Sequence, residues 1–329
     1  PAGTNSEISL EAGFCTQIMT GAPIPHGADA VIMVEQTNGF DTDNGVHFYK
    51  AANSGQNIRC AGEEIRLGSI LITSGVEITP AELGVLATFG QEKVKVIRQL
   101  KVAILSMGDE LREQGEKLNS GEIFNSNQAV LKALIEKTGA EIHLIQNIKD
   151  DAEALDVFLK KALVECDVLL TTGGISMGKY DLVRKACLTL GVDEKFWKVA
   201  QKPGKPLFFG TKGSTLIFGL PGNPISTFIC FMEFVAPVIT RRMNVHGISK
   251  TTAILASGFP TEKKKHRFLF GRAYLKKGTL YCEPTNKQGS QMLSAALFAN
   301  CIIESPPTEM SLTSGIPVII NLLPWRTLL

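Results

Sequence analysis

The sequence lacks the features that mark secreted, membrane-spanning and zinc-structured proteins. Its seven cysteines include no Cys-x-x-Cys pair, and no eighteen consecutive residues are all apolar. The first ten residues, PAGTNSEISL, have neither a basic start nor an apolar core. These absences argue against a disulfide framework, a structural zinc, a membrane span and a signal peptide, and they favour the reducing cytoplasm.

Net charge and the common catalytic motifs are scarce as well. The 329 residues carry a formal charge of +2, which gives no reason to expect a nucleic-acid or anionic-membrane surface. The five histidines are scattered, without metal-ligand spacing. No G-x-x-x-x-G-K-[ST], G-x-G-x-x-G, G-x-S-x-G or H-E-x-x-H is present, so P-loop kinases, nicotinamide enzymes, α/β-hydrolases and zincins are not supported.

What is present divides into three zones. Zone 1–97 has dense turn signals between short β-type runs and predicts a small β-rich domain. It closes with a short helix that Thr79 can cap and Gly90 can end. Zone 98–243 alternates strand and helix patterns, which predicts an α/β domain with a doubly wound parallel sheet. Zone 244–329 holds short strand-like pieces and predicts a C-terminal β domain.

In a doubly wound sheet, ligands bind at the carboxyl ends of the strands. The apolar runs KVAILSM and DVLLTT end at Met107 and Thr172, and TTGGISMGKYD overlaps the second end. Gly173 and Gly174 let the backbone approach a ligand, and the helix that follows directs its N–H groups to the same place. On this stretch alone, an anion pocket and a glycine turn with Asp181 as a helix-start residue are equally supported.

Two lysines follow in the stretch QKPGKPLFFG. Lys202 and Lys205 flank Pro203-Gly204, and the prolines hold the two ammonium groups in a short, stiff loop. Neighbouring like charges are unfavourable unless an anion compensates them. A solvated surface turn is the alternative, but the prolines and the apolar LFF that follows favour an anion site.

A third candidate loop is GLPGNPIS, which opens a long apolar helix. Asn223 suits the N-cap and Pro224 the first helical position, so a well-built helix start explains both. It does not explain Pro221 and Gly222. A second helix N-terminus at a strand end would add another oxyanion site in the same crevice.

Four acidic residues are candidates for chemistry. Asp109 and Glu110 come directly after the first strand, where carboxylates suggest Mg²⁺ coordination or acid–base work, although they could simply cap a turn. Asp181 follows the glycine loop. Asp167 begins its strand, at the end opposite the expected crevice, so a structural role is a strong alternative there.

Six segments occur in a specific order: MTGAPIPHGADAVIMVE, SMGDEL, GEIFNSN, TTGGISMGKYDLV, KPGKP and GLPGNPIS. Together they resemble the molybdopterin molybdenumtransferase family, called MoeA in bacteria, whose animal counterpart is the gephyrin E domain. The resemblance implies a multidomain homodimer with an active site shared between subunits. It implies insertion of molybdenum from molybdate into adenylylated molybdopterin, with release of AMP and help from Mg²⁺. It further implies the molybdopterin adenylyltransferase and molybdoenzymes as partners.

The same resemblance assigns roles to individual residues. Those implied as catalytic are Asp181, Asp109, Glu110, Asp167, Lys202 and Lys205, and the implied metal ligands are Asp181 and Glu110. Those implied to bind substrate are Thr20, Gly173, Gly174, Ser176, Pro221, Gly222, Asn223, Pro224, Ser226, Arg272 and Ser290. Thr20 lies in the lid motif MTGAP, which in this family faces the partner subunit's site.

The sequence departs from the family pattern in two motifs. In RCAGEE, Arg59 is kept, Cys60 and Ala61 replace basic positions, and Glu64 stands for Asp. Lys179 stands where an acid is usual. The family's first segment is absent, so we expect a piece of a longer protein. Two alternative functions remain: an inactive scaffold or binding module of the same fold, and the molybdopterin adenylyltransferase, which lacks the outer domains.

Overall fold

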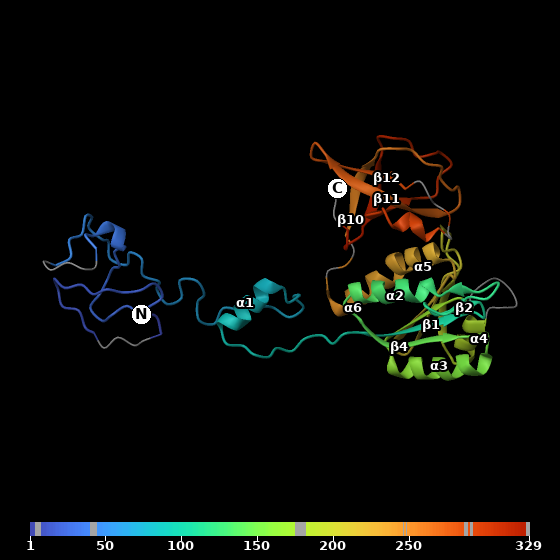
Figure 1. Ribbon diagram of the computed structural model, residues 1–329, viewed down its shortest axis with the longest axis horizontal. Coiled ribbons are helices and arrows are strands. Elements are labelled where there is room, and N and C mark those ends of the chain that lie inside the picture. Colours follow the sequence, from blue (N-terminus) through green and yellow to red (C-terminus); the bar gives the residue numbers. More distant parts are fainter. Residues whose placement is uncertain are drawn as a thin grey trace. The chain divides into compact units, whose positions relative to one another are not determined.

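The computed structural model describes residues 1–3, 8–39, 45–174, 182–245, 247, 249–285, 289 and 292–326. The chain forms two compact units, Pro1–Thr73 and Ser74–Leu329 (Figure 1). The division therefore falls inside the first zone that the sequence predicted.

The first unit is held by turns more than by regular strands. Its described residues contain one 3₁₀ turn, η1 (Val34–Gln36), and isolated bridges that pair Ser9 with His26 and Thr37 with Phe48. The β-type run AVIMVE leads into η1, where strands were expected. Glycines with positive φ, among them Gly21, Gly27 and Gly39, separate these runs.

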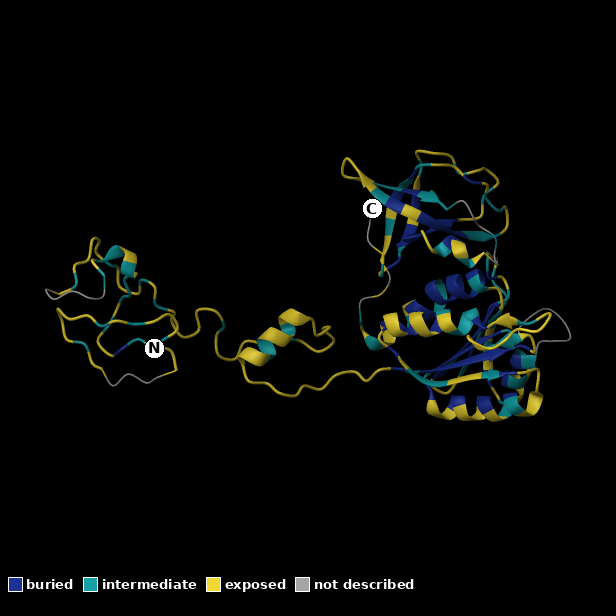
Figure 2. Cartoon of the chain, viewed as in Figure 1, coloured by how far each residue is buried: buried dark blue, intermediate teal, exposed yellow. Residues whose placement is uncertain are grey.

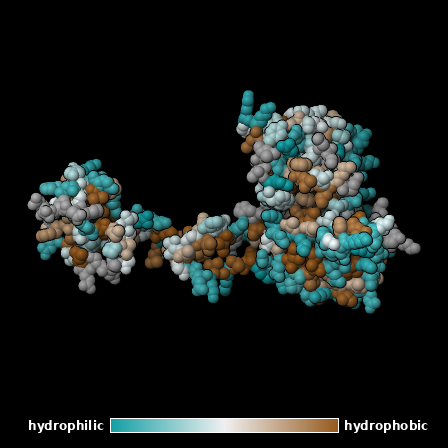
Figure 3. All heavy atoms as spheres, in the orientation of Figure 1, coloured by the Kyte–Doolittle hydropathy of each residue, from teal (hydrophilic) through white to brown (hydrophobic). Residues whose placement is uncertain are grey.

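Helix α1 (Pro80–Thr88) begins as the sequence predicted. The Thr79 side chain accepts from the backbone of Ala81, and Glu82 completes a capping box with Pro80 at the first position. None of the nine residues of α1 is buried. Figure 3 shows hydrophobic side chains gathered on α1 and the segment that follows it, where Leu83 and Val96 are exposed.

The α/β domain is built on a six-stranded sheet in the described residues, ordered β4-β1-β5-β9-β8-β6. The strand bounds in that order are Glu141–Ile148, Lys101–Met107, Val168–Thr172, Thr215–Leu220, Phe208–Lys212 and Asp193–Trp197. The first four strands are mutually parallel, as expected, whereas β8 is antiparallel to both of its neighbours. A short pair, β2 (Leu111–Arg112) and β3 (Ile123–Phe124), lies between β1 and the next helix in sequence.

Helices cover both faces of this sheet (Figure 1). One face carries α2, α5, η2 and α6, and the other carries α3 and α4. Their bounds are Ser126–Lys137 (α2), Ala152–Glu165 (α3), Leu182–Thr189 (α4), Pro224–Cys230 (α5), Phe231–Val235 (η2) and Ala236–Met243 (α6). Because β1 and β5 are covered on both sides, nearly all their residues are buried (Figure 2).

Helices α5, η2 and α6 form one continuous run, Pro224–Met243. By length and composition this run could cross a bilayer, but 67% of its most apolar window is buried inside the protein. Burial of that kind is typical of a core helix in a globular domain. Among the described residues no other helix meets the same test.

The C-terminal domain is a second six-stranded sheet, ordered β12-β10-β14-β13-β11-β7 within the described residues. Its bounds in that order are Thr279–Pro284, Lys250–Leu255, Pro317–Leu322, Cys301–Ser305, His266–Lys276 and Gln201–Lys202. Strands β11 and β12 also pair, and a 3₁₀ turn, η3 (Leu293–Ala296), precedes β13. The edge strand β7 belongs in sequence to the α/β zone. The sequence patterns did not predict that this zone would contribute a strand to the C-terminal sheet.

Candidate functional site

The parallel strands β1, β5 and β9 end at the same edge of the first sheet. Gly173 and Gly174 follow β5 there, with φ angles of +83° and +65°. A Cβ on Gly173 would stand 2.1 Å from the carbonyl oxygen of Met107, and one on Gly174 would stand 2.8 Å from Val183 Cγ2. Only glycine fits both positions, so the glycine loop is packed directly on the end of β1.

Asn127 ties three chain segments together at this edge. It lies in the first turn of α2, and its Nδ2 donates to Thr172 Oγ1 at 2.9 Å and to the carbonyl oxygen of Gly222 at 2.7 Å. A Cβ on Gly222 would lie 4.0 Å from the Cα of Gly173, so the two glycine loops are neighbours. Asn127 ends the motif GEIFNSN but was not among the predicted site residues; its position at a helix start was the available signal.

A row of polar side chains crosses three strands beside Asn127. Ser106 on β1 is in register with Asn147 on β4 and with Thr172 on β5. Ser106 Oγ, Asn147 Oδ1 and Asn127 Oδ1 are buried and have no hydrogen-bond partner among the described residues. Leaving buried polar atoms unpaired is unfavourable, so we expect ordered water or polar ligand atoms here.

Three carboxylates gather beyond the ends of β1 and β4. Asp109 Oδ1 accepts from the backbone N–H of Asp150 at 3.2 Å. Burial raises the pKa of Asp150, and the charges of Asp109 and Glu110 raise it further. Sequence reasoning selected Asp109 and Glu110 but missed Asp150, because the pattern gives no reason to choose it over its neighbour Asp151.

The donor chemistry of these acids suits Mg²⁺ carried by a phosphorylated substrate. Mg²⁺ is usually held by one or two carboxylates together with substrate phosphates and water. In the part of the chain that is described, no group of three or more His, Cys, Asp or Glu side chains converges as a complete metal cage. Of the two predicted metal ligands, Glu110 lies among the described residues and Asp181 lies outside them.

Asp167 lies at the opposite edge of the sheet, immediately before β5. Its carboxylate accepts from Arg98 Nη1 at 2.6 Å, from Arg98 Nη2 at 2.7 Å and from the backbone N–H of Lys101 at 2.8 Å. The hydrogen bonds from Arg98 lower the pKa of Asp167 below its usual value. The structure thus separates Asp167 from the other candidates, and its contacts fasten the start of β1.

The loop that carries Lys202 and Lys205 is anchored by buried contacts of Gln201 and Gly204. Gln201 is buried, and its Nε2 donates to the carbonyl oxygen of Gly204 at 3.2 Å. A Cβ on Gly204 would stand 2.5 Å from Cys230 Sγ. Lys202 and Lys205 are both exposed, and Lys202 Nζ lies 2.5 Å from Glu262 Oε1. The loop therefore holds two ammonium groups at the surface, one of them paired.

The LPGNP loop joins β9 to α5. Asn223 occupies the N-cap position with an extended backbone, but its side chain makes no capping hydrogen bond, and Pro224 is the first helical residue. Thr227 Oγ1 donates to the carbonyl oxygens of Pro221 and Asn223, which fastens the loop to the first turn. Ser226 is buried on the helix.

The remaining predicted residues lie apart or are not described. Arg272 is exposed on β11, on the same side as Phe268 and Phe270, which pack against the α/β core. Thr20 is exposed in the first unit. The predicted site residues Ser176, Asp181 and Ser290 lie outside the described residues. So does Lys179, the lysine that stands where the family usually has an acid.

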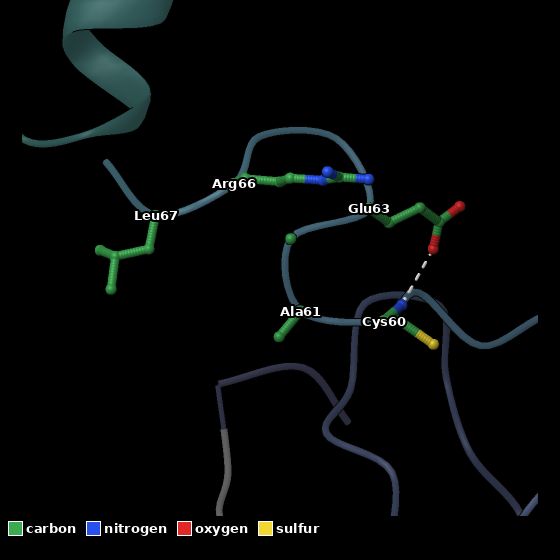
Figure 4. Close-up of a pocket in the computed structure, with 6 residues that line it drawn as sticks. Cys60, Ala61, Glu63, Arg66 and Leu67 are labelled. Carbon is green, nitrogen blue, oxygen red and sulfur yellow. Dashed lines mark hydrogen bonds between the residues drawn. The ribbon is translucent and has the colours of Figure 1, made fainter. Parts of the chain in front are cut away.

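The segment RCAGEE forms a tight loop with a surface hollow (Figure 4). The backbone N–H of Cys60 donates to Glu63 Oε2 at 2.9 Å. Figure 4 shows the Arg66 side chain lying across the loop toward the Glu63 end. Arg66, which was not among the predicted site residues, thus lines the same hollow as Cys60 and Ala61.

Three family models match the chain in order. Residues 1–90 match the MoeA N-terminal region (domain I and II), residues 103–241 match a probable molybdopterin binding domain, and residues 252–323 match the MoeA C-terminal region (domain IV). The fold and its central match define a class: multidomain proteins built around a molybdopterin-binding-type α/β domain.

Individual relatives narrow the class. The Haemophilus influenzae molybdopterin molybdenumtransferase is 35% identical over 97% of this chain and 80% of its own length; the Bacillus subtilis protein of that name is 34% identical over 99% and 79%. A crystal structure of a MoeA protein from Pyrococcus horikoshii superposes with a TM-score of 0.81 at 30% identity, covering 98% of this chain and 78% of that one. The chain belongs to the molybdopterin molybdenumtransferase family, as its motifs predicted.

Proposed function

We propose that this chain inserts molybdenum from molybdate into adenylylated molybdopterin, releases AMP and so forms molybdenum cofactor. The family supports a transferase of this kind, because its curated relatives are named molybdopterin molybdenumtransferase. The structural observation that carries the proposal is the bridge through Asn127, which fixes the glycine loop beside the LPGNP loop at one sheet edge. That edge is where an α/β sheet binds its ligand.

Each part of this edge has a role in the proposal. Gly173, Gly174 and Gly222 let the backbone approach a phosphate closely. Ser106 Oγ donates a hydrogen bond to the substrate or to water beside it, or accepts one from them, and Asn127 Oδ1 accepts one. The predicted substrate-binding residues of the LPGNP loop form the rest of the proposed site. Ser176, Ser290, Arg272 and Thr20 keep the binding roles that the resemblance implies.

The two lysines hold the oxyanion. Lys202 and Lys205 are exposed in a loop anchored by Gln201 and Gly204, so their ammonium groups are presented without burying charge. Molybdate carries two negative charges and offsets the repulsion between the lysines.

Mg²⁺ is part of the proposal as a cofactor. When bound, it would neutralise charge on the phosphate groups. Glu110 and Asp181 are the proposed ligands, and Asp109 and Asp150 add negative charge beside Glu110. Burial is the main cause of the raised pKa of Asp150, and the charges of Asp109 and Glu110, which a cation would offset, raise it further.

We also propose a homodimer in the cytoplasm, with an active site that both subunits share. The exposed apolar side chains on and after α1 support a protein partner, because such patches are usually covered in an assembly (Figure 3). The molybdopterin adenylyltransferase, which supplies the substrate, and molybdoenzymes, which receive the product, are proposed as transient partners. Light scattering on the purified chain tests the dimer, and a monomer at micromolar concentration would refute it.

An anaerobic assay tests the activity and separates it from both alternatives. The chain is incubated with adenylylated molybdopterin, molybdate and Mg²⁺, and AMP is measured by chromatography. Molybdate-dependent AMP release is expected. Binding of molybdopterin without AMP release would favour a scaffold, although the anchored lysine loop has no evident use in one. In a parallel incubation with ATP and molybdopterin, formation of adenylylated molybdopterin and pyrophosphate would favour the adenylyltransferase.

A further inference from the structure

Lys202 is already engaged by a carboxylate of this chain. Its Nζ lies 2.5 Å from Oε1 of Glu262, which comes from the loop before β11. The Lys202 side chain is 54% exposed and that of Glu262 is 29% exposed. The pair is therefore open to solvent and can exchange partners, because exposed ion pairs are held only weakly.

Other cations surround the same carboxylate. Strand β7 pairs in parallel with β11 so that Lys202 is in register with Arg267. In-register residues of paired strands place their side chains on one face, where two like charges repel. Glu262 relieves that repulsion. Its pKa is lowered first by the hydrogen bond from Lys202 and then by the charges of Lys202, Lys265 and Arg267.

The pairing of β7 with β11 also determines the face of the sheet on which Lys202 lies. Arg267 and Arg272 are five residues apart on β11, and strand alternation puts them on opposite faces. Arg272 lies on the side of Phe268 and Phe270, toward the α/β core, and the Arg267 guanidinium lies over the Phe259 ring, in the separate core of the β domain. Lys202, in register with Arg267, is thus held toward Glu262 on the face opposite Arg272.

We propose that Glu262 is an internal competitor for the oxyanion site: its carboxylate holds Lys202 until the substrate oxyanion takes its place. The inference rests on the proposed function, because it assumes that Lys202 binds molybdate. Glu262 is a specificity-determining residue and takes no part in the chemistry. Molybdate has two charges and displaces the single carboxylate, whereas a weakly charged anion does not.

The test compares matched variants in molybdate binding. Glu262→Gln keeps the size of the side chain and removes its charge. Glu309→Gln is the control, because Glu309 pairs with the adjacent Lys263 at 3.5 Å on the same surface but does not contact Lys202. Isothermal titration with sodium molybdate gives the Kd of wild type, of each variant and of Lys202→Met with and without Glu262→Gln.

We expect Glu262→Gln to tighten molybdate binding about two- to fivefold, the range set by an exposed ion pair. Glu309→Gln should leave the Kd unchanged, and Glu262→Gln should have no effect in the Lys202→Met background. The gain should shrink as salt is raised. In turnover, Glu262→Gln should lower KM for molybdate and leave kcat unchanged.

Each of four results would overturn the proposal. Unchanged or weaker binding by Glu262→Gln would show that the carboxylate does not compete. Equal tightening by Glu309→Gln, or tightening that persists without Lys202, would reduce the effect to the general surface charge. In each case wild type still binds molybdate, and the proposed function stands. Failure of wild type itself to bind molybdate would remove both the proposed function and the role of Glu262.

Discussion

Replacing Gly173 with alanine tests whether the glycine loop is locked onto the end of β1. The substitution has two costs that can be separated. A positive φ of +83° costs an alanine about 1–2 kcal/mol. Its Cβ would also stand 2.1 Å from the backbone oxygen of Met107, and overpacking of this kind adds about 1–3 kcal/mol. The expected loss is about 2–5 kcal/mol.

Gly191 provides a matched control in the same domain. Its φ is +78°, but a Cβ there would meet nothing within 4 Å. Gly191→Ala should therefore lose only the backbone part, about 1–2 kcal/mol. Urea unfolding of both variants, followed by far-UV circular dichroism, measures the difference. If Gly173→Ala is no more destabilised than Gly191→Ala, the glycine loop is not packed on Met107, and the site is not preformed at this edge.

Three further predictions concern Asn127, Asp167 and Lys250. Asn127→Ala should lower the free energy of unfolding by about 1–3 kcal/mol, because two hydrogen bonds are lost; a loss below about 0.5 kcal/mol in urea unfolding would contradict the bridge. The pKa of Asp167 is lowered in the folded state, so its contribution to stability is present above the unfolded value and is lost as pH falls through the folded one. Asp167→Asn should therefore destabilise the protein above about pH 5 and progressively less below about pH 4, and a pH-independent difference in urea unfolding would oppose this. Lys250 lies 3.2 Å from Glu233 and 2.5 Å from Glu304. Both carboxylates are nearly buried, but the Lys250 side chain is 52% exposed, so Lys250→Met should cost about 1–3 kcal/mol in thermal unfolding, and an unchanged Tm would contradict the pairing.

The sequence predicted those parts of the fold that local patterns determine. Continuous apolar runs identified β1 and β5, whose ends carry the glycine and acidic loops, and the Thr79 cap located α1. Strand β7 was missed because two residues carry no periodicity and its partner lies more than sixty residues away. The antiparallel direction of β8 was missed for a related reason, since apolar content does not encode direction.

The site divides in the same way. Residue types at a strand end were enough to select Asp109 and Glu110, and the prolines of the loop QKPGKPLFFG were enough to select Lys202 and Lys205. Asn127 and Glu262 were missed because their roles come from tertiary pairing across 45 and 60 positions. Asp167 was selected by motif alone, and its contact with Arg98 gives it a structural task that only the three-dimensional arrangement reveals.

The lysine loop is attached at its two ends to two different domains of the same compact unit. The Lys202 end is a strand of the C-terminal sheet, whereas Gly204 is packed against Cys230 on α5 in the α/β core. Any rotation of one domain against the other must therefore change the separation of the two ammonium groups. An oxyanion that bridges both lysines would favour one interdomain angle, and that angle would in turn set the affinity for the oxyanion.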